Sequence, residues 1–164
     1  MAKQQPIEIF MPPNILKAKV GGSGGIDPNA LKRAEQAIED MKEEFADWIV
    51  KDVDNLAAAR TGFDKNRNDE TLGTLYRSSL DLKGQATTFE FPMVARIAHS
   101  LCRLADGAPD GGKALPATLI DAHVDAIRVI VRDKIKDPNN RVAVVLATEL
   151  EKKVADYLEK QAPR

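Results

Sequence analysis

The chain has 164 residues, and its 24 lysines and arginines nearly balance its 25 aspartates and glutamates, which leaves a formal net charge of -1. This balance argues against nucleic acid as a partner. No uncharged apolar run approaches the roughly 20 residues of a membrane span, which argues against a membrane protein. With one cysteine, Cys102, and no signal-like apolar segment near the N-terminus, we expect a cytoplasmic protein without a disulfide framework.

The first 25 residues are rich in proline and glycine and disfavour both helix and regular strand. We expect an extended arm that ends in a Gly-rich hinge over residues 1–25, and a single helical domain over residues 26–164. The apolar residues of the arm either lie on this domain or dock onto another molecule. We favour the first arrangement.

A long first helix is expected to begin at Asp27 and Pro28, because aspartate caps free amide groups and proline is tolerated at the first helical position. Apolar residues then recur every three or four positions, which predicts one stripe that faces a core. The stripe consists of Leu31, Ala34, Ile38, Met41, Phe45, Trp48, Ile49, Val53 and Leu56. We expect the following turn at Thr61, Gly62 and the polar residues 64–68.

Four more helices follow by the same criteria. The second begins near Asn68 or Asp69, the third runs from Pro92 to Gly107, the fourth covers about residues 116–136, and the last begins near Arg141. Residues 107–116 should form a mobile or irregular loop. The expected buried positions of these four helices are Leu72, Leu75, Tyr76, Leu82, Ala86 and Phe89; Val94, Ile97, Ala98, Leu101, Leu104 and Ala105; Leu119, Ile120, Ala126, Ile127, Ile130 and Val131; and Val142, Val145, Leu146, Leu150, Val154 and Leu158.

The fold class that these patterns predict is all-α. No segment shows the sustained two-residue alternation of a strand, and short connections favour antiparallel neighbours in an up-and-down bundle. One residue does not suit its helix: a glycine in a helix interior costs ~1 kcal/mol relative to alanine. Gly84 therefore indicates either a break or a surface that something must approach closely.

The segment Tyr76 to Leu104, YRSSLDLKGQATTFEFPMVARIAHSLCRL, resembles the histidine phosphotransfer (Hpt) family of bacterial phosphorelays. Its residues Leu80, Asp81, Leu82, Lys83 and Gly84 align with the family's His-x-Leu-Lys-Gly signature. The resemblance implies an Hpt-type four-helix bundle over about residues 28–136, with an additional C-terminal helix at about 141–160. It also implies that a response regulator receiver domain or a histidine kinase is the partner, with magnesium on the receiver and no cofactor on this chain.

The chain departs from the family at Leu80, which stands where the phospho-accepting histidine is expected. An isobutyl side chain has no lone pair with which to attack phosphorus. The resemblance therefore implies a phosphocarrier-type signalling protein that is not an enzyme and lacks its acceptor, with Leu80, Asp81, Lys83, Gly84 and Gln85 as partner-binding residues. The sequence leaves open whether Leu80 is a natural or an engineered residue, and whether it points outward or is partly buried.

Two histidines offer other chemistry. His99 is expected on a solvated helix surface and is a less favoured alternative phosphorylation site, because no glycine follows it by one turn. For His123 a structural role, capping or packing at the bundle flank, is expected. A zinc site needs three or four ligands, and two histidines with one cysteine do not supply them, so no metal site is expected.

An alternative from a different functional class is a helical adaptor or structural protein that uses its N-terminal arm for association. No nucleophile, base and orienting group can be combined from the spacing of residues into an active site. The sequence does not set the oligomeric state.

Overall fold

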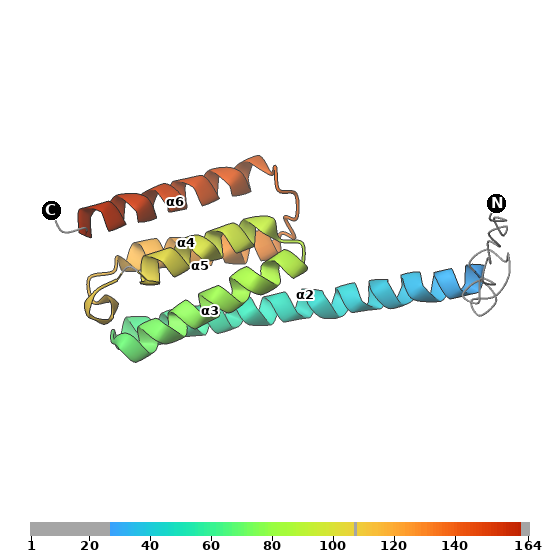
Figure 1. The fold of residues 1–164 in the computed structure, drawn as a ribbon, viewed down its shortest axis with the longest axis horizontal. Helices are drawn as coiled ribbons and strands as arrows, with labels where there is room; N and C mark the ends of the chain where they lie inside the picture. Colours follow the sequence, from blue (N-terminus) through green and yellow to red (C-terminus); the bar gives the residue numbers. More distant parts are fainter. Residues whose placement is uncertain (1–26, 107, 162–164) are drawn as a thin grey trace, which may run out of the picture. The chain divides into compact units, whose positions relative to one another are not determined.

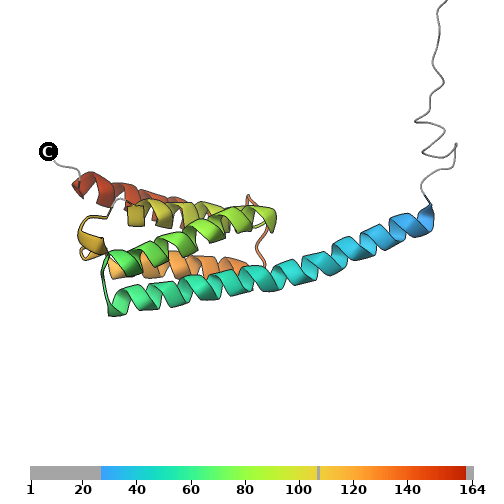
Figure 2. The ribbon, with the colours of Figure 1, turned by 60° about the horizontal axis from the view of Figure 1, so that its bottom comes forward.

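The computed structural model describes residues 27–106 and 108–161, except for the side chains of residues 42–46. The described residues contain helices and no strand, which confirms the all-α prediction for them (Figures 1 and 2). The predicted arm and hinge at residues 1–25 lie outside this part of the chain. None of the described helices is both long and apolar enough to cross a membrane. The helices are α2 (Pro28–Lys65), α3 (Asp69–Thr88), α4 (Pro92–Asp106), the short 3-10 helix η1 (Asp110–Gly112), α5 (Ala117–Arg132) and α6 (Arg141–Gln161).

The chain divides into two compact units, Met1–Asp40 and Met41–Arg164. In the first unit the described residues form the beginning of α2. The side chain of Asp27 accepts a hydrogen bond from the backbone N–H of Asn29 at 3.0 Å, so the predicted helix start is confirmed. The side chains of residues 31–40 are all exposed, and the prediction that this part of the apolar stripe faces a core is wrong.

The second unit contains the hydrophobic core. Here α4 contacts α3, α5 and α6, and Figures 1 and 2 show these helices running alongside one another. All six predicted inward residues of α4 are buried, because its apolar positions follow the helical period closely. The predicted inward residues of α3 and α5 are also buried, apart from the partly buried Tyr76 and Leu119.

The apolar stripe of α2 changes face near the start of this unit. Ile49 is 1% exposed, whereas Met41 and Trp48 are 50% and 52% exposed. Adjacent residues of an α-helix differ by about 100° in direction. Trp48 and Ile49 therefore belong to different faces, and only the second face, with Ile49, Val53, Leu56, Ala59 and Phe63, reaches the core.

The predicted turn after the first helix begins too early. α2 continues through Thr61 and Gly62 to Lys65, and Phe63 near its end is only 1% exposed. Thr61 donates its hydroxyl to the Ala57 carbonyl at 2.9 Å, so its side chain forms a hydrogen bond within the helix. Burial of Phe63 outweighs the weak helix preference of the threonine and glycine before it.

The buried face of α6 differs from the predicted one. Val142, Val145 and Leu146 were expected inside, but they are 64%, 54% and 36% exposed. Leu150 and Val154 are buried as predicted and Leu158 is partly buried, but Ala143 and Ala147 are buried in place of the first three. α6 thus turns two small alanines toward its neighbours, and Arg96 of α4 holds this orientation by donating two 2.6 Å hydrogen bonds to the Glu151 carboxylate.

The ends of α3 and α5 are set by left-handed residues. Lys134 has φ 52°, and the N–H of Ile135 donates to the Ile130 carbonyl at 2.9 Å. This pattern is a Schellman-type stop, which ends α5 at Arg132, before the predicted position near residue 136. Glu90 has φ 63°, and Phe91 donates to Ala86 at 2.8 Å in the same way after α3.

The loop before α5 packs against the connection between α2 and α3. Gly111 and Gly112 are buried and have φ values of 67° and 72°. A Cβ at Gly112 would lie 2.9 Å from Phe63 Cζ. Arg67 supports the loop by donating to the Leu115 carbonyl at 2.7 Å. The loop is irregular, as predicted, but it is also closely packed.

We expect Gly112→Ala to lower the free energy of unfolding by about 1–3 kcal/mol. Alanine is strained in the left-handed backbone conformation at this position, and its Cβ would also clash with the Phe63 ring. Gly62→Ala is the matched control, since a Cβ there meets nothing within 4 Å. The control should be neutral or stabilising. Urea unfolding of both variants measures the difference, and equal effects would contradict this role for Gly112.

Candidate functional site

The exposed face of α3 is defined by the opposite, buried face of the same helix. Leu75, Ser79, Leu82 and Ala86 are each 0% exposed. The helix starts with a capping box in which the Asn68 side chain accepts from the Thr71 N–H at 2.9 Å. Because buried side chains recur along one side of α3, residues about half a turn away from them point outward.

Leu80 and Gly84 lie on this outward side, one turn apart. Leu80 is 42% exposed, so it lies on the outward side of α3 while the structure covers part of its side chain. Gly84 is exposed, and α3 continues through it without a break. A Cβ at Gly84 would meet nothing within 4 Å, so packing inside the described structure does not require glycine there.

The other signature residues flank these two. Asp81 is exposed and lines a groove toward α2, while Lys83 and Gln85 are half-buried. Lys83 is near Cys102 of α4: burial raises the pKa of this thiol, and the Lys83 charge partly offsets the rise. Leu82 is fully buried, as the signature implies for the residue between Asp81 and Lys83. The structure therefore brings Leu80 and Gly84 together on one surface, with Asp81 and Lys83 beside them.

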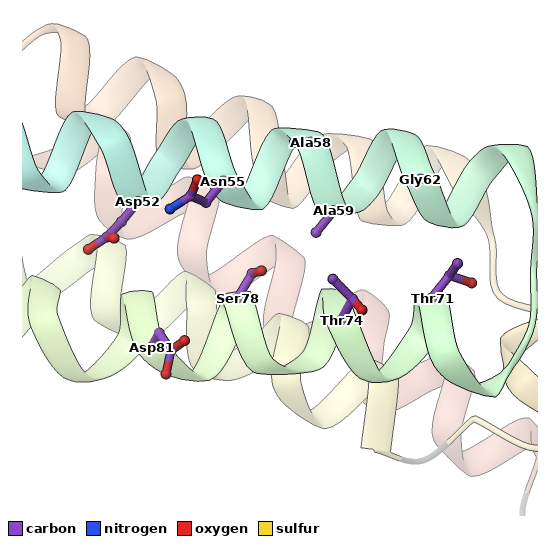
Figure 3. A pocket seen from close by; sticks show the side chains of 9 residues that line it. All are labelled: Asp52, Asn55, Ala58, Ala59, Gly62, Thr71, Thr74, Ser78 and Asp81. Atoms are coloured by element: carbon purple, nitrogen blue, oxygen red, sulfur yellow. The ribbon is translucent and has the colours of Figure 1, made fainter.

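Sequence reasoning missed the groove between α2 and α3, which has a volume of about 500 Å³ (Figure 3). Figure 3 shows Asp52 of α2 and Asp81 of α3 at the same end of it. The lining residues are Asp52, Asn55, Ala58, Ala59, Gly62, Thr71, Thr74, Ser78 and Asp81. A signal was present in the sequence, because Asp52 and Asn55 continue the three-and-four spacing that ends its apolar part at Trp48.

Asp52 carries the unusual electrostatics of this groove. Its Oδ2 atom is buried and has no hydrogen-bond partner among the described residues. Burial raises the pKa of Asp52, the negative charge of Asp81 raises it further, and Lys51 opposes the shift. Within residues 27–106 and 108–161, no three His, Cys, Asp or Glu side chains are grouped closely enough to hold a metal ion.

The two histidines occupy contrasting environments. His99 is exposed on α4, as expected, and lies near enough to Glu151 of α6 to help lower the pKa of that carboxyl, after the larger effect of Arg96. His123 is 0% exposed, so its structural role lies in the interior and not at the flank. Its Nδ1–H donates to the Leu119 carbonyl at 2.7 Å, and its Nε2 accepts from the Ser100 hydroxyl at 3.0 Å. In the neutral form of the imidazole both ring nitrogens are therefore hydrogen-bonded.

The chain matches no protein-family model, no curated protein and no solved structure.

Burial lowers the pKa of His123, with the Leu119 hydrogen bond opposing the shift. The unfolded chain therefore binds this proton at a higher pH than the folded protein does, and acidification below about pH 6.5 should reduce stability by at most about 1.4 kcal/mol per pH unit. Urea unfolding at several pH values should show that His123→Gln loses this part of the acid sensitivity. His99→Gln should keep it. An unchanged pH profile in His123→Gln would contradict the assignment.

Proposed function

We propose that this protein is an Hpt-like phosphorelay signalling module that binds receiver or histidine kinase domains through the exposed face of α3. The binding residues are Leu80, Asp81, Lys83, Gly84 and Gln85. In this proposal α2, α3, α4 and α5 correspond to the four-helix bundle of the family, and α6 is the additional helix. The protein is a phosphocarrier-type module without an acceptor, and it is not an enzyme.

The observation that carries the proposal is the pairing of Leu80 with Gly84. A glycine in a helix interior lowers stability, so its presence calls for a compensating reason. Packing inside the described structure supplies none, because the space beside Gly84 is open. Close approach of another molecule to α3 supplies one, and it places that molecule directly beside the exposed Leu80.

The chemistry at position 80 favours binding without phosphoryl transfer. Leucine offers no nucleophile, but an apolar side chain that a partner buries completely contributes roughly 1.5–3 kcal/mol. Leu80 is already partly covered on α3, so its gain is smaller than this. A module of this kind sequesters a receiver, with Lys83 next to the contact as a positive charge suited to an acidic or phosphorylated surface.

The test compares the Leu80 chain with its Leu80→His variant against a panel of receiver domains and their kinases, recording binding and phosphate separately. We expect both chains to bind the same receiver and only Leu80→His to accept phosphate. Failure of both chains to bind any receiver would contradict the proposal and favour an adaptor that associates through residues 1–25. Phosphate transfer to His99 in the Leu80 chain would also overturn it.

Two substitutions at Gly84 give a second prediction: alanine should raise stability, and glutamine should weaken receiver binding. Gly84→Ala should raise the free energy of unfolding by about 0.5–1 kcal/mol, since the helix accommodates the methyl group. Gly84→Gln should weaken receiver binding about tenfold or more, because its side chain occupies the approach surface.

Gly62→Ala and Gly62→Gln are the matched controls for these variants, because Gly62 is also a helical glycine with open space at its Cβ. It lines the α2–α3 groove at the end away from Asp81 (Figure 3). They should leave receiver binding unchanged. Calorimetric titration with the receiver measures both pairs, and equal loss of binding in the two glutamine variants would argue against the α3 face.

A further inference from the structure

The groove between α2 and α3 carries its charge at one end. Four polar side chains lie there, opposite the end that Gly62 lines, and we call them the polar end: Asp52, Asn55, Ser78 and Asp81 (Figure 3). Among the described residues that line the groove, two are aspartates and none is a lysine or an arginine. Charge complementarity therefore favours a cationic occupant at the polar end.

The two ends of the groove also differ in how their polar groups are hydrogen-bonded. Away from the polar end, the Thr71 hydroxyl donates to the Asn66 carbonyl at 2.5 Å, and the Thr74 hydroxyl donates to the Glu70 carbonyl at 3.0 Å. At the polar end, none of the four side chains forms a hydrogen bond or an ion pair with another residue that the structure describes. The chain thus leaves a group of acceptors unused at one end of the groove.

Asp52 shows most clearly that this group of acceptors suits a donor from outside. Its Oδ2 atom is buried, and a buried carboxylate oxygen without a hydrogen bond lowers stability. Burial raises the pKa of Asp52 and the charge of Asp81 raises it further, so the two carboxylates are close enough to repel each other. Lys51 opposes this shift, but its side chain is exposed and does not line the groove. A cation bound at the polar end would stabilise both carboxylates.

We propose that the polar end binds the guanidinium group of an arginine side chain, presented by the protein that packs on Leu80 and Gly84. This inference rests on the proposed function for the surface that the partner covers. It adds Asp52, Asn55 and Ser78 to the residues that recognise the partner, and it states what chemical group the partner must present.

A guanidinium group fits these acceptors better than an ammonium group does. Arginine carries five N–H donors in a planar fork that matches carboxylates, whereas lysine carries three donors around one point charge. The polar end offers two carboxylates, an amide oxygen and a hydroxyl oxygen. Asp81 is exposed and directly follows Leu80 in the chain, so a partner on the exposed face of α3 lies next to the polar end.

The test titrates the isotope-labelled chain with a short peptide, acetyl-Ala-Arg-Ala-amide, and follows the backbone amide chemical shifts. We expect saturable shifts at the polar end, with a dissociation constant in the millimolar range. The same peptide with lysine should bind more weakly. The same peptide with citrulline, an uncharged side chain of nearly the same shape as arginine, should not bind.

Asp52→Asn should raise the dissociation constant of the arginine peptide about tenfold, because it removes one of the two charges. Asp81→Asn should have a similar effect, and because Asp81 is exposed this variant is expected to fold normally. Asp54→Asn is the matched control: it removes the same charge from α2 at an exposed residue that does not line the groove, and it should leave the affinity unchanged. Circular dichroism verifies that each variant is folded.

Three results would overturn the inference: no saturable shift with the arginine peptide, equal binding of the citrulline peptide, or an equal loss of affinity in Asp54→Asn. The titration needs no receiver domain, so it is separate from the test of the proposed function. Binding of the arginine peptide by a chain that binds no receiver would contradict only the proposed function. Binding of a receiver by a chain that does not bind the arginine peptide would contradict only this inference.

Discussion

The rotation of α3 about its own axis is the constraint on which the candidate site depends. Leu75, Leu82 and Ala86 are completely buried, and Ser79 between them satisfies its hydroxyl by donating to the Leu75 carbonyl at 2.8 Å. A rotation by one residue, about 100°, would expose these apolar groups. Burial of one face of α3 therefore determines what its other face presents.

The exposed face of α3 carries an apolar side chain at Leu80 and no side chain at Gly84. Leu80 projects outward and Gly84, one turn later, leaves the backbone accessible. The groove toward α2, with the buried Oδ2 atom of Asp52, borders the same face through Asp81. Two histidines remain, and they are not interchangeable: His123 is held neutral in the core, and His99 is exposed on α4. The face is thus suited to contact between proteins, whereas the leucine at position 80 supplies no nucleophile.

Sequence periodicity identified the helices and most of the core, but it was less informative about which side of a helix is buried. The inward residues of α4 form one unambiguous stripe, and all were correctly predicted. In α2, Trp48 and Ile49 are adjacent members of two different stripes, and spacing alone did not separate them. In α6, two alanines pack inward while larger valines stay exposed, because close approach of helices favours small residues over the most apolar ones.

The groove at Asp52 was missed because it is formed by residues of two helices, and the spacing of residues along one helix does not show which helix it pairs with. The positions of Leu80 and Gly84 one turn apart, by contrast, could be predicted because both residues lie on one helix.

The most direct test of the α3 face is a map of backbone amide chemical shifts in the isotope-labelled Leu80 chain as a receiver domain is titrated into it. We predict that perturbations concentrate between Ser79 and Ala86 and on Asp52, at the end of the α2–α3 groove that Asp81 lines (Figure 3). The solvent-exposed side of α6, including Val142 and Val145, should be unaffected. Receiver binding that perturbs α6 or the beginning of α2 and leaves Leu80 and Gly84 unchanged would contradict the account.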